Sequence, residues 1–600
     1  MTESTQGMTK EMMEYINSYV GGIMSQYIKG ERTSPFFDAH QENKKGNYDD
    51  AYVDLFANQL KLDIIEYKQN RQVTECAFFA PRKSDTNEQK KKFVYKIAFL
   101  VFPPKLNDQE SRTKSHISYQ KTLSLLSTKF KDQEFQKIAQ KTKFKMARLA
   151  EHRELWESLK TRPLSELITN PTAMPVEVSR EEELDPFFNF LEKNENVDHN
   201  KHLEYDTEWL NDEECFKFNK GAVYTDGRMD LCKQVVGPLW INKLMNSLKK
   251  NEHIKHFLLG NNIIGTIGAL AIKNFMQTPH KSRINTWYIA GNAIDSTGIE
   301  YIVDAFENDT DIKELWLKRN PICVDGMKHI NRLLKNNKSI ITLDLHNTAT
   351  LDEGVKQIFD GLKENTTLEN LYLEANGITH ESAKYISEYF DMLVKENRKG
   401  LTSLWIGMNK LGDDGVIEIV NSLKNYKYIE RLCVGSNMIT GIGMKAIYNA
   451  FKDHPTLRML DVGMYKSTAD MEMVTNRVSD EGAKYIADLI KENKVLEYIS
   501  ILHNDISNEG IKLISEALQK NNTLLFLDFK QYFVGIDQPI HKSIMDKLKQ
   551  NRESRNIGGV EKEYQRYLKH TKEIVKIDSI YRNKKYQTCG QKKTCSIKNH

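Results

Sequence analysis

Apolar residues change their spacing halfway along the stretch between Leu496 and Asn521. Leu496, Ile499 and Ile501 fit a short strand, and an asparagine follows them. The apolar residues further on recur at the three-to-four spacing of an amphipathic helix, namely Ile511, Ile514 and Leu518. The pattern therefore predicts a strand and then a helix within one short stretch.

The same pattern recurs along the chain as apolar-x-x-apolar-x-apolar-x-x-Asn-x-apolar-x-x-x-Gly. Its asparagine position is occupied by Asn262, Asn292, Asn320, Asn376, Asn409, Asn437 and Asn504, and by Thr348 in one copy. The glycine position returns after 28 residues from Gly326 to Gly354. With degenerate copies at both ends, about eleven units lie between residues 222 and 533.

A strand, an asparagine turn and a helix repeated at this period are the signature of leucine-rich repeats. No single unit can close its own core, so neighbouring units stack. The asparagine amide can satisfy backbone groups in the turn. The glycine leaves room for close packing or for an unusual backbone angle.

The period of 28 residues and the long helical half resemble the ribonuclease-inhibitor type of leucine-rich repeat protein. This subgroup also includes the Ran GTPase-activating proteins and several repeat-bearing bacterial proteins. The resemblance covers about half of the chain. It implies an α/β solenoid, or horseshoe, with parallel strands on the concave face and helices outside.

The chain is expected to divide into four parts: an α-rich N-terminal domain (1–174), an acidic linker or cap (175–221), the solenoid (222–533), and a basic C-terminal helix and tail (534–600). One spacing is longer than the rest because residues 464–475 interrupt a turn. This insertion is expected at the rim of the concave surface, where it is either functional or a tolerated surface loop.

Residues between the consensus apolar positions should point to the concave side and stack from strand to strand. The central row reads Leu258, Tyr288, Trp316, Asp344, Tyr372, Trp405, Cys433, Asp461 and Ser500. Tyrosine and tryptophan dominate interface hot spots, and large aromatic rings are rarely left exposed unless something covers them. The alternative is that these rings only favour strands and pack on one another.

We predict a protein-binding surface here, called the concave strip below. It comprises Tyr288, Trp316, Asp344, Tyr372 and Trp405, flanked by Glu314, Lys318, His346 and Glu374. In the following repeat units the flanking row consists of glycines, namely Gly407, Gly435 and Gly463. These glycines leave room for a partner or for the inserted loop.

Candidate chemistry is sparse. Asp344, His346 and Glu374 are neighbours, but a single histidine favours a polar recognition patch over a metal or acid–base site. No phosphate-cradling loop, nucleophile motif or metal-ligand spacing is visible in the sequence. We therefore expect no catalytic residue and no cofactor, with the activity of residues 1–221 left open.

Charge is unevenly distributed, although the formal net charge is only +4. Residues 81–148 hold 17 basic and 6 acidic side chains, and residues 541–600 hold 16 and 6. Residues 175–214 hold 14 acidic and 3 basic side chains. Both basic segments are candidates for contact with an anionic partner (nucleic acid, membrane or acidic protein). The alternative for residues 81–148 is that they and residues 175–214 neutralise each other or are solvated, and the alternative for residues 541–600 is a solubilising tail.

The N-terminus shows no secretory signal, and no apolar stretch is long enough to span a membrane. Seven scattered cysteines do not suggest a disulfide framework, so a cytoplasmic location is expected, with the nucleus also possible. The leading functional prediction is an intracellular protein-binding scaffold or adaptor. The resemblance implies an alternative, a GTPase activator with Arg319 among its candidate rim residues. A third reading is an enzyme or ubiquitin-ligase adaptor whose activity lies in residues 1–221.

Overall fold

The computed structural model describes residues 178–205, 207–465, 475–531 and 536–583. The helices and strands in these ranges belong to one compact unit, comprising Arg162–Lys530 and Gln538–His600. The predictions for residues 1–174, including the basic segment 81–148, and for residues 466–474 and 584–600 lie outside the described residues.

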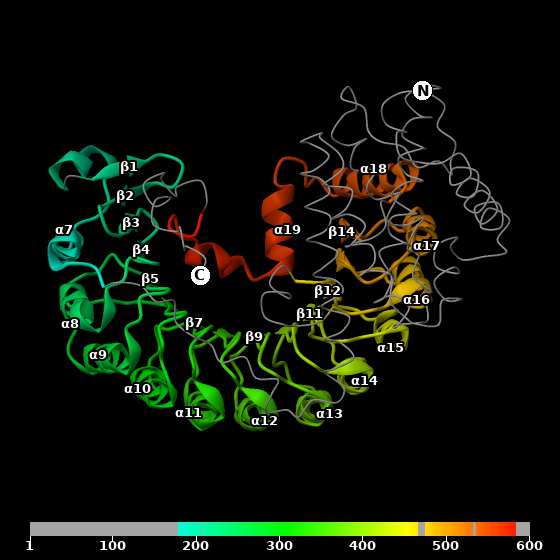
Figure 1. The fold of residues 1–600 in the computed structure, drawn as a ribbon, viewed down its shortest axis with the longest axis horizontal. Coiled ribbons are helices and arrows are strands. Elements are labelled where there is room, and N and C mark those ends of the chain that lie inside the picture. Colours follow the sequence, from blue (N-terminus) through cyan, green and yellow to red (C-terminus); the bar gives the residue numbers. More distant parts are fainter. Residues whose placement is uncertain (1–177, 206, 466–474, 532–535, 584–600) are drawn as a thin grey trace, which may run out of the picture. The chain divides into compact units, whose positions relative to one another are not determined.

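The strands form one sheet and follow each other in sequence order (Figure 1). They are β1 (Glu208–Leu210), β2 (Cys215–Lys217), β3 (Ala222–Tyr224), β4 (Arg228–Asp230), β5 (His256–Leu258), β6 (Thr286–Tyr288), β7 (Glu314–Trp316), β8 (Thr342–Asp344), β9 (Asn370–Tyr372), β10 (Ser403–Trp405), β11 (Arg431–Cys433), β12 (Met459–Asp461), β13 (Tyr498–Ser500) and β14 (Phe526–Asp528). Strands β1 to β4 pair antiparallel, and every pair from β4 to β14 is parallel.

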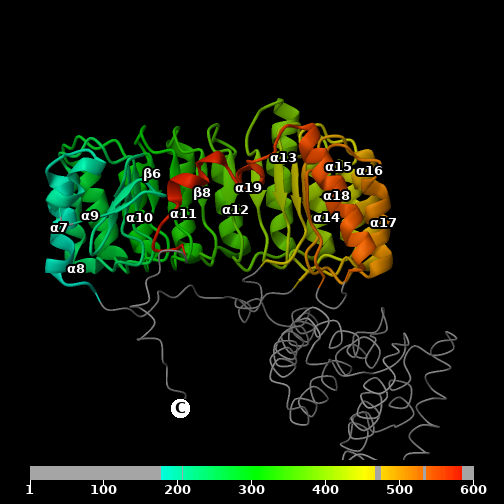
Figure 2. The same cartoon turned by 90° about the horizontal axis from the view of Figure 1, so that it is seen from above.

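Helices form the outer layer and alternate with the parallel strands (Figures 1 and 2). They are α8 (Gly237–Leu248), α9 (Gly265–Gln277), α10 (Ser296–Phe306), α11 (Cys323–Asn336), α12 (Leu351–Leu362), η4 (His380–Ser382) with α13 (Ala383–Glu396), α14 (Gly412–Leu423), α15 (Gly441–Phe451), α16 (Ser479–Glu492) and α17 (Asn508–Leu518). The predicted α/β repeat solenoid, with parallel strands inside and helices outside, is confirmed.

Elements outside the repeats lie at both ends. They are α7 (Glu181–Glu192) and η3 (His199–Tyr205) before the sheet, and α18 (Gln538–Ser554), α19 (Glu561–Lys569) and η5 (Lys572–Ile577) after it. Phe187 and Phe190 of α7 pack against Phe218, with ring centroids 5.4 and 5.6 Å apart. Together with the antiparallel strands β1 to β3, α7 therefore covers the apolar end of the array.

A buried asparagine joins neighbouring units. The side-chain amide of Asn320 donates to the carbonyl oxygens of Ile289 (3.0 Å) and Leu317 (2.7 Å). Its Oδ1 accepts from the backbone N–H groups of Asn292 (2.8 Å) and Ile294 (3.1 Å). One side chain thus satisfies four backbone groups, as expected for the consensus asparagine.

A second set of asparagines stands at the helix ends and was not predicted. Asn337 donates to the carbonyl oxygen of Phe306 (2.7 Å) and accepts from the N–H of Ile340 (2.8 Å). The available signal was a spacing of 28 residues, from Asn337 to Asn365 and from Asn493 to Asn521.

The consensus glycine is required by close packing. A Cβ atom on Gly326 would lie 2.4 Å from Cγ2 of Ile322 and 2.9 Å from Cγ2 of Ile299. The backbone of Gly326 is not in the left-handed region. Close packing, and not an unusual backbone angle, therefore explains the glycine at this position.

Replacing Asn320 with alanine should lower the free energy of unfolding by roughly 2–4 kcal/mol, because four buried backbone groups lose their partner. The measurement is urea unfolding followed by circular dichroism. Asn336→Ala is the matched control, because Asn336 is exposed at the end of α11, and its effect should stay within about 0.5 kcal/mol. Equal effects of the two substitutions would contradict the role given to the buried amide.

Candidate functional site: the concave strip and its C-terminal cover

The strand register stacks the predicted central row. Tyr288 pairs with Trp316, Trp316 with Asp344, Asp344 with Tyr372, and Tyr372 with Trp405. The short side chain of Asp344 lets the rings on either side of it approach, with the centroids of Trp316 and Tyr372 5.4 Å apart. The rings of Tyr372 and Trp405 are stacked, with centroids 3.9 Å apart. The four predicted aromatics thus form one continuous row.

The chain's own C-terminal residues cover this row. We call residues 561–583, which comprise α19, η5 and the residues after it, the C-terminal strap. The strap crosses the concave side of the sheet from α18 towards β4 (Figure 1). The four rings of the strip are only 2–5% exposed, and Ile577 belongs to the same buried cluster, with Ile574 and Tyr581 packed against it. The predicted binding surface is therefore already occupied.

Helix α19 attaches the strap at the C-terminal end of the array. Leu568 is buried in a cluster with Met459, Tyr498 and Phe526. The ammonium of Lys569 lies 2.9 Å from a carboxylate oxygen of Asp528 and 4.6 Å from the centre of the Tyr498 ring. Apolar and charged contacts thus combine at this end.

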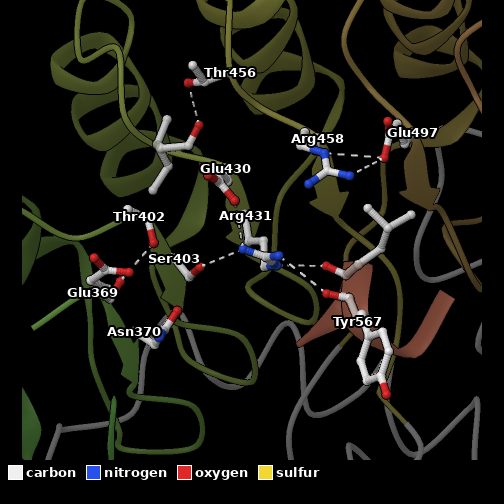
Figure 3. A network of polar contacts seen from close by, with 12 residues as sticks. Glu369, Asn370, Thr402, Ser403, Glu430, Arg431, Thr456, Arg458, Glu497 and Tyr567 are labelled. Carbon is white, nitrogen blue, oxygen red and sulfur yellow. Dashed lines mark hydrogen bonds and ion pairs between the residues drawn. The ribbon is translucent and has the colours of Figure 1, made fainter. Parts of the chain in front are cut away.

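An arginine holds the backbone of the strap nearby (Figure 3). Arg431 donates to the carbonyl oxygens of Leu568 (2.9 Å) and Tyr567 (3.3 Å). The same guanidinium contacts Ser403 Oγ (3.3 Å) and Glu430 Oε2 (3.0 Å), which orient it. Because its acceptors on the strap are backbone carbonyl oxygens, the hydrogen bonds of Arg431 to the strap do not depend on which side chains the strap carries.

The middle of the strap lies over the aromatic row. The ring of His570 is nearly parallel to those of Tyr372 and Trp405, with centroids 6.3 and 6.1 Å away. Lys576 Nζ lies 3.4 Å from Oε1 of Glu314, whose Oε2 accepts from Trp316 Nε1 at 3.2 Å. The Lys576 pair therefore reaches a fully buried carboxyl group of the strip.

Burial raises the pKa of Glu314 to about 7, against the opposing effect of the Lys576 ammonium. Burial also lowers the pKa of His570 to about 4, and the cations nearby, chiefly Lys569 and Lys318, act in the same direction. Burial thus favours a neutral Glu314, the Lys576 ammonium of the strap favours its charged form, and His570 is held neutral.

The far end of the strap is bound to β3, β4 and β6. The buried carboxylate of Asp230 accepts from Ser579 Oγ (3.0 Å) and from the N–H of Ile580 (3.1 Å). Arg582 donates to the Tyr288 hydroxyl at 2.7 Å, with its guanidinium carbon 4.3 Å from the centre of that ring. Arg228 donates to the carbonyl oxygen of Asp578 at 3.0 Å. Both ends of the strap are thus attached to the array.

The described start of the insertion also lies on the concave side. A Cβ atom on Gly407 would lie 2.5 Å from the ring of Tyr465, and one on Gly435 would lie 3.1 Å from it. The Tyr465 hydroxyl contacts the thiol of Cys433. Of the two uses predicted for the glycine row, the structure therefore shows the inserted loop, through Tyr465, in the space that the glycines leave.

The flanking polar residues form a buried cluster. Oδ1 of Asp344 accepts from the N–H of His346 at 2.9 Å, and Nδ1 of His346 lies 3.7 Å from Oε2 of Glu374. Burial raises the pKa of Asp344 to about 6 and that of Glu374 to about 8, and it lowers the pKa of His346 to about 4. The ammonium of the partly exposed Lys318 acts against this rise in the pKa of both carboxyl groups.

Within the residues that the structure describes, no group of three histidine, cysteine, aspartate or glutamate side chains could hold a metal ion. None of the helices in the same ranges has both the length and the apolarity to cross a bilayer.

Sequence reasoning placed the strip residues in one row but missed the strap residues that meet them. These are chiefly Leu568, Lys569, His570, Lys576, Ile577 and Arg582. The available signal was a run of isoleucines three residues apart, Ile574, Ile577 and Ile580, in an otherwise polar tail.

Comparisons with known proteins do not identify a family for this chain. No family model matches the chain, and no curated protein matches its sequence. Among solved structures, actin-binding site 2 of leiomodin-1 is 14% identical and covers 30% of this chain and 95% of its own, with a TM-score of 0.24. The tropomodulin C-terminal domain of Caenorhabditis elegans is 11% identical and covers 44% and 96%, with a TM-score of 0.17. At these TM-scores neither likeness supports an argument about function.

Replacing Ile577 with aspartate should detach the middle of the strap, because a carboxylate would be buried against aromatic rings without a partner. Trp316 and Trp405 would then meet water, and tryptophan emission should shift to longer wavelength. Ile442→Asp is the matched control, because Ile442 is 60% exposed. The same emission from both variants would mean that the strap does not shield the rings.

Acid should also loosen the strap through His570. The pKa of His570 is about 4 when the strap is seated, and its ordinary value is 6.5. The neutral ring therefore contributes its full stabilisation of the seated strap above pH 6.5, and this stabilisation is lost as the pH falls towards 4. Glu314 acts in the opposite direction, because protonation favours its buried state. We therefore compare wild type with His570→Phe, which keeps a ring but does not titrate. Between pH 6.5 and 4 the strap amides of the wild type should lose more protection from hydrogen exchange than those of His570→Phe. Identical pH profiles would exclude His570 as the group that makes the strap sensitive to acid.

Proposed function

We propose that this chain is a non-catalytic, protein-binding solenoid that recognises a protein partner through the concave strip. In this proposal it is an intracellular scaffold or adaptor of the ribonuclease-inhibitor type. The helices α8 to α17, with 11 to 14 residues each, are consistent with that type. Free thiols at Cys215, Cys232, Cys323 and Cys433 are consistent with a reducing compartment.

The observation that carries the proposal is the polypeptide already seated on the strip. The strap buries Ile577 against the aromatic row and makes hydrogen bonds and ion pairs with the array along its length. The strip therefore has the properties of a polypeptide-binding surface: aromatic anchors, polar groups around them, and a rigid curved support.

A partner reaches the strip in this proposal only after the strap has left. The connection between α18 and α19 offers a place to bend, since Cβ atoms on Gly558 or Gly559 would meet no atom within 4 Å. Val560, directly after them, is 51% exposed. Rotation in this connection would carry the strap away from the strands that it covers.

The test is a pull-down from cell extract with three full-length forms: wild type, a strap-loosened form, and that form with Trp316→Ala and Trp405→Ala. The loosened form carries Leu568→Asp and Ile577→Asp, one in each of the two buried clusters. We expect a protein that the loosened form retains and the ring-deleted form does not, followed by direct binding of that protein in purified form.

Leu239→Asp with Ile442→Asp is the matched control, since these side chains are 67% and 60% exposed and the substitutions are of the same kind. The control should behave as wild type does. If all forms retain the same proteins, or if loss of the rings changes nothing, the concave strip is not the recognition surface.

A further inference from the structure

The contacts between strap and strip divide into two kinds. Two arginines of the array, Arg228 and Arg431, donate to backbone carbonyl oxygens of the strap. These bonds can form with almost any sequence. The side chains of the strap are met instead by carboxylates and rings of the array, so these groups decide which sequence fits.

Three cations of the strap meet such groups. Lys569 pairs with Asp528, and Lys576 pairs with Glu314. Arg582 contacts the Tyr288 hydroxyl and lies over its ring. The pairs are spread along the array, from β14 through β7 to β6. A segment with cations seven and then six residues apart would satisfy all three.

Between the cations lie aliphatic anchors. Ile577 is buried in the cluster of strip aromatics, and Ile580 is buried with Cys215, Ala222 and Tyr224. A polyanion would bring like charge to Glu314 and Asp528, and a purely apolar segment would leave Glu314 buried without its cation. The strip therefore discriminates by both charge and shape.

From these observations we infer that the partner of the concave strip is a basic polypeptide segment that imitates the strap. It carries cations at the places of Lys569, Lys576 and Arg582 and aliphatic side chains at those of Ile577 and Ile580. It binds by taking the place of the strap. This inference rests on the proposed function and adds the chemistry of the partner.

The experiment measures binding of labelled peptides to the full-length Leu568→Asp/Ile577→Asp form by fluorescence anisotropy. The reference peptide has the sequence of residues 561–583. It should bind the loosened form at least about 10-fold more tightly than wild type, in which the strap competes. Binding should weaken with added salt, because ion pairs contribute.

Single charge reversals then separate the roles of two lysines. A Lys576→Glu peptide should bind roughly 10–100-fold more weakly, since it places a carboxylate against Glu314. A Lys562→Glu peptide carries the same change of charge at an exposed position and should bind as the reference does. Introducing Glu314→Lys into the loosened form should restore binding of the Lys576→Glu peptide.

The outcomes distinguish the inference from the proposed function. If the reference peptide does not bind the loosened form, the strip is not a polypeptide-binding surface and both fail. If the reference and Lys576→Glu peptides bind equally, the strip binds polypeptide without the proposed selectivity and only the inference fails. If the loosened form is not folded by circular dichroism, Arg582→Ala with Lys576→Ala takes its place, since these changes remove two contacts between strap and array without placing a charge in a buried cluster.

Discussion

The in-register stacking of parallel strands is the constraint on which the rest of the structure depends. Strands about 4.8 Å apart force equivalent side chains of successive units into rows, one row in the core and its neighbours on the concave face. The core row includes Trp287, Leu315 and Leu343, and the concave row beside it includes Tyr288, Trp316 and Asp344. Buried asparagines fix the distance and orientation of the units. Because neighbouring residues of a strand point in opposite directions, the position in each strand of three residues decides whether a side chain packs in the core or lies on the concave face.

This constraint explains why so much was visible in the sequence. The repeat length, the strand positions and the membership of the concave row follow from local spacing, and the parallel sheet then follows from stacking. Gly407 and Gly435 also indicated that the concave side leaves room for another group beside them. The spacing did not show which group lies beside these glycines. In the structure the ring of Tyr465 fills the space.

The strap could not be placed in the same way, because its contacts join residues far apart in the chain. Ser579 contacts Asp230, 349 residues earlier in the chain, and Lys576 contacts Glu314, 262 residues earlier. A three-residue spacing of isoleucines is compatible with a short helix anywhere on the surface. The basic charge of residues 541–600 led to two interpretations, an anionic partner or a solubilising tail. The structure shows a third outcome at three positions, because carboxylates of the chain itself pair with Lys569, Lys576 and Arg566.

The most direct test of the central claim is amide hydrogen exchange of residues 561–583 in the full-length wild-type chain. The N–H of Ile580 is bonded to a fully buried carboxylate, and the strap covers rings that are almost inaccessible to water. We predict that the strap amides exchange much more slowly than those of a free peptide of the same sequence. Exchange at the rate of the free peptide would show that the strap does not rest on the concave strip.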